Sequence, residues 1–315
     1  MTEKAENILS QSQALTDRII ETIGEIVVGK DRQIKLALSC LLSGGHLLIE
    51  DSPGVGKTTM AHVLAQALGL GFQRIQFTSD LMPADILGVS IFDADAKKFR
   101  FHPGPIFNQL ILADEVNRAT PKTQSALLEV MEEGRITIDG ETFKMPEPFF
   151  VVATQNPRQQ IGTFSLPESQ LDRFLMRIEM GYPDRASERK LLESPDRRVM
   201  FESLKPAINL SQLSQLQQQV RAIVASPALL NYVQDLLDAS RSDNRFSSGL
   251  SPRAGLALLS AARSWAMIAG RKMVLPEDVQ AVAPSVMGHR LMGQGDLAGP
   301  SEASVRALIE SVPIP

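Results

Sequence analysis

The chain has 315 residues, of which 43% are hydrophobic and 22% charged, a balance typical of a folded globular protein. Because this length exceeds what one compact domain needs, we expect two domains. The formal net charge of −4, without a long basic run, argues against holding nucleic acid by bulk electrostatics, so no nucleic-acid partner is expected. The polar N-terminus and the lack of any run of about 20 apolar residues predict a cytoplasmic protein with no membrane span.

The first part of the chain has apolar residues at helical spacing, which predict helices over 6–23 and 31–43. Cys40, the one cysteine, lies within the second of these among apolar residues. We therefore expect a buried thiol that packs in the core, rather than a reactive one. A single cysteine also excludes a disulfide within the chain.

Short apolar runs then predict buried strands at 46–50, 72–77, 109–115, 149–154 and 174–180. Between them lie stretches that predict helices over 57–69 and 121–133. Alternating strands and helices are typical of a parallel α/β sheet that is covered by helices on both faces.

Two segments that alternate in polarity interrupt this order and predict hairpins. Residues 135–144 alternate around Asp139-Gly140, a strong two-residue turn signal, and residues 89–102 alternate around a longer polar loop. Beyond about residue 186 the chain is predicted to be helical, with no convincing strand. We therefore divide it into three parts: an α/β domain with its N-terminal helix over 1–185, a connector over 186–208 and an all-α domain over 209–315.

The stretch from Asp51 to Thr59, "DSPGVGKTT", predicts a loop that binds phosphate. The usual pattern is a glycine, four residues, then Gly-Lys-Ser/Thr, and this chain has Asp51 at the place of the first glycine. Glycines matter where the backbone takes positive φ or approaches the phosphate closely, and Gly54 and Gly56 fill those inner places. A strand before the loop and a helix after it strengthen the prediction; the alternative is an ordinary glycine-rich turn.

Polar residues that follow two other predicted strands support the same interpretation. Asp114 and Glu115 end the strand in "QLILADE", where a carboxylate faces the ligand crevice of a parallel sheet and can hold Mg²⁺. Glu115 can polarise a water for attack on the γ-phosphate. Asn156 follows "VVATQ" and can bond both that water and a phosphate oxygen. The alternatives are a solvated acidic pair and a plain Asn-Pro turn.

Several motifs together resemble the MoxR family of AAA+ ATPases, in the family's order and over roughly residues 28–282: "EDSPGVGKTT", "ILADEVNRATPKTQSALLEVMEE", "VVATQNP", "LPESQLDRF" and "SPRAGLALLSAARSWAMIAGR". The resemblance implies an α/β fold, with an AAA+ P-loop NTPase core that carries a parallel sheet and hairpin inserts, followed by an all-α helical lid domain. Asp51 is a variation associated with such loops, which favours a working site.

The resemblance also implies roles in a Mg²⁺-dependent ATPase. Lys57 would contact the β- and γ-phosphates, Thr58 and Asp114 would hold Mg²⁺, Glu115 would be the catalytic base and Asn156 the first sensor. The remaining residues implied to bind ATP are Val28 and Gly29 at the adenine and Pro53, Gly54, Val55, Gly56 and Thr59 in the loop.

Two arginines are implied to complete the site. Arg173 resembles the arginine finger that reaches a neighbouring subunit's ATP, and Arg253 resembles the second sensor at the start of a lid helix. For Arg173 the alternative is a structural ion pair with Asp172, and for Arg253 a surface arginine. Arg118 remains open between an interface residue and a solvated helix start.

The function implied by the resemblance is ATP-driven, chaperone-like remodelling or maturation of a client protein by a ring, expected to be a homo-hexamer. The partner implied by the family carries a von Willebrand factor A domain. Three alternatives stay open: a chelatase-type motor subunit, a DNA-acting AAA+ motor, and a nucleotide-gated scaffold with little turnover. The hairpins at 89–102 and 135–144 are implied to face a pore or a client, or to be decorative.

Overall fold

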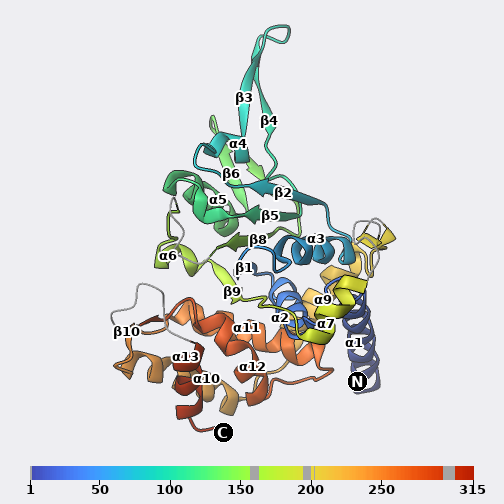
Figure 1. Ribbon diagram of the computed structural model, residues 1–315, viewed down its shortest axis with the longest axis vertical. Helices are drawn as coiled ribbons and strands as arrows, with labels where there is room; N and C mark the ends of the chain where they lie inside the picture. The colour runs from blue at the N-terminus through green and yellow to red at the C-terminus, as the bar shows by residue number, and fades with distance from the viewer. Residues whose placement is uncertain (1, 157–162, 194–199, 202, 294–301) are drawn as a thin grey trace.

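The computed structural model describes residues 2–156, 163–193, 200–201, 203–293 and 302–315, with side chains from residue 9 onward. A five-stranded parallel sheet lies at the centre, in the order β2-β5-β8-β1-β9 (Figure 1). Its strands are β1 (His46–Glu50), β2 (Phe72–Gln76), β5 (Leu110–Asp114), β8 (Phe150–Gln155) and β9 (Phe174–Ile178). The predicted parallel sheet is confirmed, and each strand lies within two residues of its predicted bounds.

Helices of the α/β part follow the predicted order. The four that the sequence predicts are α1 (Thr2–Gly24), α2 (Asp31–Leu42), α3 (Lys57–Ala67) and α5 (Pro121–Glu133). Shorter turns that carry no helical period of their own are α4 (Pro83–Leu87), η1 (Val116–Arg118) and α6 (Glu168–Leu171). A run of three to five residues is too short to show a repeat of 3.6, so sequence periodicity misses such elements.

Side chains along each central strand alternate between two cores. Leu47 and Ile49 of β1 pack with α1, α2, α3 and the C-terminal helices, whereas Leu48 packs with α4 and α5 on the opposite face. This is the period of two that a strand imposes. Both faces of the sheet are therefore buried, as predicted for a parallel sheet.

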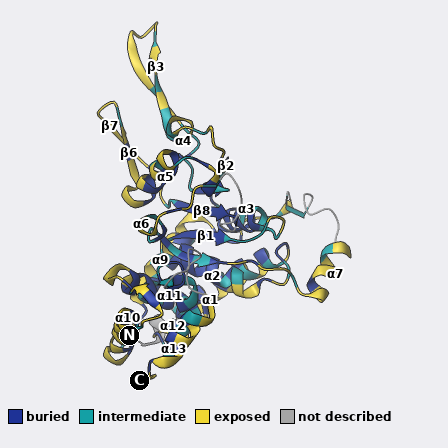
Figure 2. Cartoon of the chain, turned by 60° about the vertical axis from the view of Figure 1, so that its left-hand side comes forward, coloured by how far each residue is buried: buried dark blue, intermediate teal, exposed yellow. Residues whose placement is uncertain are grey.

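Both predicted hairpins are present. Strands β3 (Gly88–Asp93) and β4 (Lys98–Pro103) form the first, and β6 (Arg135–Ile138) and β7 (Glu141–Lys144) form the second. Asp139 and Gly140 both take positive φ, 51° and 83°, as the tight turn requires. Figure 2 shows the β3–β4 hairpin extending from the body with a largely exposed surface.

The C-terminal part is mostly helical, with α7 (Arg185–Glu193), α9 (Leu210–Ala222), α10 (Pro227–Ser242), α11 (Pro252–Ile268), α12 (Pro276–Met287) and α13 (Glu302–Ser311). The prediction of no strand in this part is wrong, because β10 (Phe246–Ser248) pairs with β11 (Met292–Gly293). These strands have three and two residues, too few to show alternation. The predicted connector begins with α7, and its residues 194–199 and 202 lie outside the described part.

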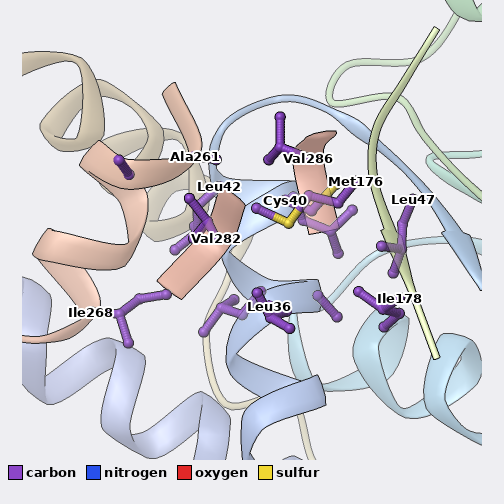
Figure 3. Close-up of a cluster of buried hydrophobic side chains, with 14 of the residues drawn as sticks. Leu36, Cys40, Leu42, Leu47, Met176, Ile178, Ala261, Ile268, Val282 and Val286 are labelled. Atoms are coloured by element: carbon purple, nitrogen blue, oxygen red, sulfur yellow. The ribbon is translucent and has the colours of Figure 1, made fainter. Parts of the chain in front are cut away.

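The helical part and the sheet share one continuous core. Figure 3 shows side chains of α2, β1, β9, α11 and α12 packed around Cys40. Cys40 is fully buried, as predicted, and burial raises the pKa of its thiol. Ser39 Oγ also donates to the carbonyl of Ala261 on α11 at 3.1 Å. Among the described residues, no helix is both long and apolar enough to cross a lipid bilayer.

His46 is a buried residue whose environment favours the uncharged imidazole. Its Nε2 lies 3.0 Å from the carbonyl oxygen of Met131, and the N–H of Val151 donates to its Nδ1 at 3.0 Å. Burial lowers its pKa to about 4, whereas the unfolded chain titrates at about 6.5. Between about pH 6.5 and 4 only the unfolded chain takes up this proton, so acid stabilises the unfolded state over that range.

We therefore expect the free energy of unfolding to fall from about pH 6.5 towards 4, by up to about 1.4 kcal/mol per pH unit for this one group. Urea unfolding at several pH values measures the slope. His46→Gln, whose amide can both donate and accept, should flatten it, while the same change at the exposed His102 should not. An equal slope in His46→Gln and the parent protein would contradict the assignment.

Candidate nucleotide site

Parallel strand pairing brings the predicted site residues to one edge of the sheet. Asp51 follows β1, Asp114 ends β5 and Asn156 follows β8. The register places Glu50 opposite Gln155 and Gln76 opposite Asp114, so the carboxyl ends of these strands are level. This edge is where open α/β sheets bind their ligands.

The predicted phosphate loop joins β1 to α3, which begins at Lys57. Gly54 has a φ of 87° and Gly56 a φ of 94°, values that other residues rarely adopt. A Cβ at either position would meet no atom within 4 Å, so it is the backbone conformation, and not crowding, that requires glycine here. Such a turn into a helix N-terminus directs backbone N–H groups at one point and suits an anion.

Asp51 has a structural role at the place where the usual pattern has glycine. Its Oδ1 accepts the N–H of Ser52 at 2.6 Å, and its Oδ2 accepts the N–H of Gly181 at 2.6 Å. Lys30 Nζ in turn donates to the carbonyls of Gly181 and Tyr182, at 3.0 and 2.9 Å. The carboxylate thus ties the loop to the segment after β9.

The predicted adenine-binding pair lies next to Lys30 in the chain. Val28 and Gly29 immediately precede Lys30, which bonds the segment that Asp51 also bonds. Gly29 has a φ of 71°, and a Cβ there would collide with Ser187 of α7. Only glycine therefore allows α7 to approach so closely.

Lys57 is buried at the centre of the site. Its ammonium donates to Asn156 Oδ1 at 3.0 Å and to the carbonyl oxygen of Asp51. Burial lowers the pKa of Lys57, and the charges of Asp51 and Asp114 oppose that shift. A buried cation beside a loop of N–H groups is a strong site for phosphate oxygens.

Asp114 is held by three neighbouring groups. Thr154 Oγ1 donates to its Oδ1 at 2.5 Å, and Arg74 Nη2 to its Oδ2 at 2.6 Å. Thr58 Oγ1 also lies 3.4 Å from Oδ2. A hydroxyl and a carboxylate oxygen at this spacing are the hard ligands that Mg²⁺ prefers, so the donor set fits that ion alongside phosphate oxygens.

Glu115 is fixed by three bonds. It takes a φ of 56°, and its Oε1 accepts from Asn156 Nδ2 at 3.0 Å. Its Oε2 accepts from Gln76 Nε2 at 2.9 Å and pairs with Arg118 Nε at 3.0 Å. Arg118, left open by the sequence, therefore makes a contact within its own chain. Asn156 bonds both Lys57 and Glu115, so one amide links the phosphate side of the site to the predicted base.

Three residues that contact the acidic pair were missed by the sequence analysis: Arg74, Gln76 and Thr154. Arg74 and Gln76 are two positions apart on β2 and so share a face, which their polar side chains in "RIQ" signal. The alternation alone does not show what these side chains contact, because that depends on the pairing of β2 with β5. Thr154 likewise required the pairing of β5 with β8.

Arg173 and Arg253 lie together elsewhere, around Glu132 at the end of α5. Arg173 Nη2 is 2.7 Å from Glu132 Oε2, and Arg253 Nη2 is 2.8 Å from Glu132 Oε1. The hydrogen bond from Arg253, followed by the charge of Arg173, lowers the pKa of Glu132. They line a pocket of about 370 Å³ that also includes His46 and Leu256.

This pocket is at the opposite edge of the sheet from Lys57. It includes His46, the first residue of β1, whereas the phosphate loop follows the last, and Arg173 immediately precedes β9. Five residues of strand separate the two edges by about 16 Å. Within one chain, the two arginines and the phosphate loop are therefore not brought together.

This fold and the loop at its carboxyl edge define the class as a P-loop ATPase with a helical lid. The family described as ATPase family associated with various cellular activities (AAA) matches residues 46–176, and the AAA lid domain matches residues 238–311. A crystal structure of a candidate ATPase from Cytophaga hutchinsonii superposes with a TM-score of 0.88 and 34% identity, over 100% of this chain and 99% of that one.

Relatives narrow the class to one family. Chaperone MoxR1 of Mycobacterium tuberculosis is 40% identical over 91% of this chain and 78% of its own length. Protein MoxR of Methylorubrum extorquens is 31% identical over 95% and 94%. A protein named YeaC from Bacillus subtilis, described as uncharacterised, is 43% identical over 96% and 95%. This chain belongs to the MoxR family of AAA+ ATPases.

We predict that Asp51 contributes to nucleotide affinity through the two bonds of its carboxylate. Asp51→Ala and Asp51→Gly should each weaken ATP binding by about tenfold, since hydrogen bonds to a charged group contribute about 1.5–3 kcal/mol. Titration with a fluorescent ATP analogue measures the affinity, and Asp95→Ala on the exposed hairpin turn is the control. Parent-like affinity in Asp51→Gly, which restores the usual pattern, would show that the carboxylate is dispensable.

Proposed function

We propose that this chain hydrolyses ATP in a ring of identical subunits, with a hexamer as the expected size, and that each active site forms between two neighbours. One observation carries the proposal: the two arginines lie at the edge of the sheet opposite the phosphate loop. A contact that joins one edge of a subunit to the opposite edge of the next is heterologous, and such contacts form a ring when the rotation between neighbours closes and a filament when it does not.

In this proposal, the carboxyl edge binds MgATP. In the loop from Pro53 to Thr59, the backbone N–H groups of residues 54–59 hold the phosphates together with Lys57. Val28 and Gly29 hold the adenine. Thr58 and Asp114 hold Mg²⁺, which when bound neutralises charge on the β- and γ-phosphate oxygens. The support is the 3.4 Å approach of those two side chains and the burial of Lys57.

Glu115 acts as the base in the proposed reaction. It takes a proton from a water that attacks the γ-phosphorus, and the bond to the β-phosphate oxygen breaks to release ADP. Asn156, which already bonds Glu115 at 3.0 Å, orients that water. Arg173 and Arg253 of the neighbouring subunit neutralise charge on the transferred phosphoryl group, a contribution that can reach about 10³–10⁵ in rate.

We further propose that hydrolysis remodels a client protein. One relative is named a chaperone, and the β3–β4 hairpin presents apolar side chains to solvent, including two aromatic ones. Phe92 is 54% exposed and Phe99 is 69% exposed, and their rings meet at 5.4 Å. Exposed aromatic pairs of this kind are typical of protein contact sites. The family resemblance favours a client or partner with a von Willebrand factor A domain.

The ring predicts that specific ATPase activity rises with protein concentration as subunits assemble. Glu115→Gln and Arg173→Ala should each lose at least about tenfold in kcat while still binding ATP, because one lacks the base and the other the neighbour's cation. Arg306→Ala, which removes an exposed ion pair on α13, is the matched control. Activity that is independent of concentration and survives Arg173→Ala would contradict the shared site.

A one-to-one mixture of the two inactive variants tests the shared site directly. Glu115→Gln subunits keep Arg173, and Arg173→Ala subunits keep Glu115. In random rings about a quarter of the sites then combine both residues, so the mixture should regain activity that neither variant has alone. A mixture as inactive as its components would mean that Arg173 does not act on a neighbour.

A further inference from the structure

Five charged side chains form a chain of alternating sign from the lid to the predicted arginine finger. The order is Arg290, Asp172, Arg253, Glu132 and Arg173. The successive N–O distances are 2.6, 3.8, 2.8 and 2.7 Å. Asp172 therefore pairs with two lid arginines, while Arg173 pairs with Glu132.

Arg290 is the buried end of this chain. Its side chain is 5% exposed, whereas those of Arg173 and Arg253 are 27% and 55% exposed. It follows α12, inside the match to the AAA lid domain. Burial lowers the pKa of this guanidinium, and its bond to Asp172 opposes the shift. Removing a cation from water is unfavourable unless bonds offset it, so its partners matter.

Nearly all the bonds of Arg290 go to the segment that carries Arg173. Its Nε donates to Asp172 Oδ1 at 2.6 Å, and its Nη2 donates to the carbonyls of Asp172 and Phe174 at 3.1 and 2.7 Å. Its Nη1 donates to the carbonyl of Leu175 at 3.1 Å and to that of Val286, on α12, at 2.5 Å. One planar group thus holds the backbone on both sides of Arg173.

The guanidinium suits this task because it is a rigid fork with several donors in one plane. A lysine would supply the same charge, but all its N–H groups would donate from a single nitrogen atom. A second contact from the lid supports the same segment, since His289 Nε2 lies 3.0 Å from the carbonyl oxygen of Phe174. The N–H of Arg173 itself donates to a local group, the carbonyl of Gln170, at 3.2 Å.

From this geometry we infer that Arg290 is a positioning residue for Arg173, through which the lid sets where the finger meets the neighbouring subunit's ATP. The inference rests on the proposed function, a ring with shared sites. It assigns a place in the reaction to a buried lid residue that lies outside the phosphate loop. Loss of Arg290 should therefore damage the site of the neighbour and spare the nucleotide site of its own chain.

The test uses Arg290→Met, with Arg290→Lys as a second variant that keeps the charge and loses the fork. Each variant alone is expected to lose at least about tenfold in kcat while its affinity for a fluorescent ATP analogue stays within about twofold. Thermal unfolding and ring mass identify a variant that fails to fold or assemble, in which case the other variant decides. Parent-like kcat in a folded variant would overturn the inference.

Mixtures of two variants distinguish the loss of a working arginine finger from a general structural defect. Arg290→Met mixed with Glu115→Gln should regain as much activity as Arg173→Ala mixed with Glu115→Gln, because the Glu115→Gln subunit donates an intact finger. Arg290→Met mixed with Arg173→Ala should stay inactive, because both lack a working finger. A purely structural defect predicts no such difference between partners.

Failure of the inference and failure of the ring give different results. If Arg173→Ala and Glu115→Gln complement each other while Arg290→Met and Glu115→Gln do not, the damage lies in the chain's own site and the inference is wrong. If Arg173→Ala and Glu115→Gln fail to complement, the shared site is wrong, and the inference falls with it.

Discussion

Parallel pairing of the central strands is the constraint on which the rest of this structure depends. Because all five strands run in one direction, residues that follow them gather at one edge and residues that precede them gather at the other. Asp51, Asp114 and Asn156 occupy the first edge, and Arg173 occupies the second. A single sheet therefore separates the predicted phosphate-binding groups from the predicted arginine finger, and this separation is the physical reason for proposing a shared site.

A second feature is that the charged groups named for the two edges already have polar partners. Lys57 bonds Asn156, Arg74 bonds Asp114, and Glu132 bonds both Arg173 and Arg253. Pairing limits the cost of burying each charge. Phosphate oxygens and a metal ion would replace these partners, so ligand binding exchanges one set of ionic contacts for another and does not add charge to an uncharged crevice.

The lid packs directly against the sheet and shares a hydrophobic core with it. Apolar side chains of α2, β9 and α12 share one core (Figure 3), and Arg290 adds polar bonds to the start of β9. Close packing transmits a displacement across such an interface, because the interior has few voids to absorb it. A shift of the lid would therefore be transmitted to the start of β9.

Local features could be predicted from the amino-acid sequence alone: the strands of the central sheet, the hairpin turn at Asp139-Gly140, the glycines of the phosphate loop and the acidic pair after β5. These follow from short-range patterns, since apolar alternation and turn residues act over a few positions. Other contacts could be found only in the folded chain: Arg74 and Gln76 contact the acidic pair, Arg253 lies beside Arg173, Arg290 bonds the segment around Arg173, and β10 pairs with β11. Strand order and lid docking bring together residues as far apart as Glu132 and Arg253, and no local pattern in a single sequence encodes such a pairing.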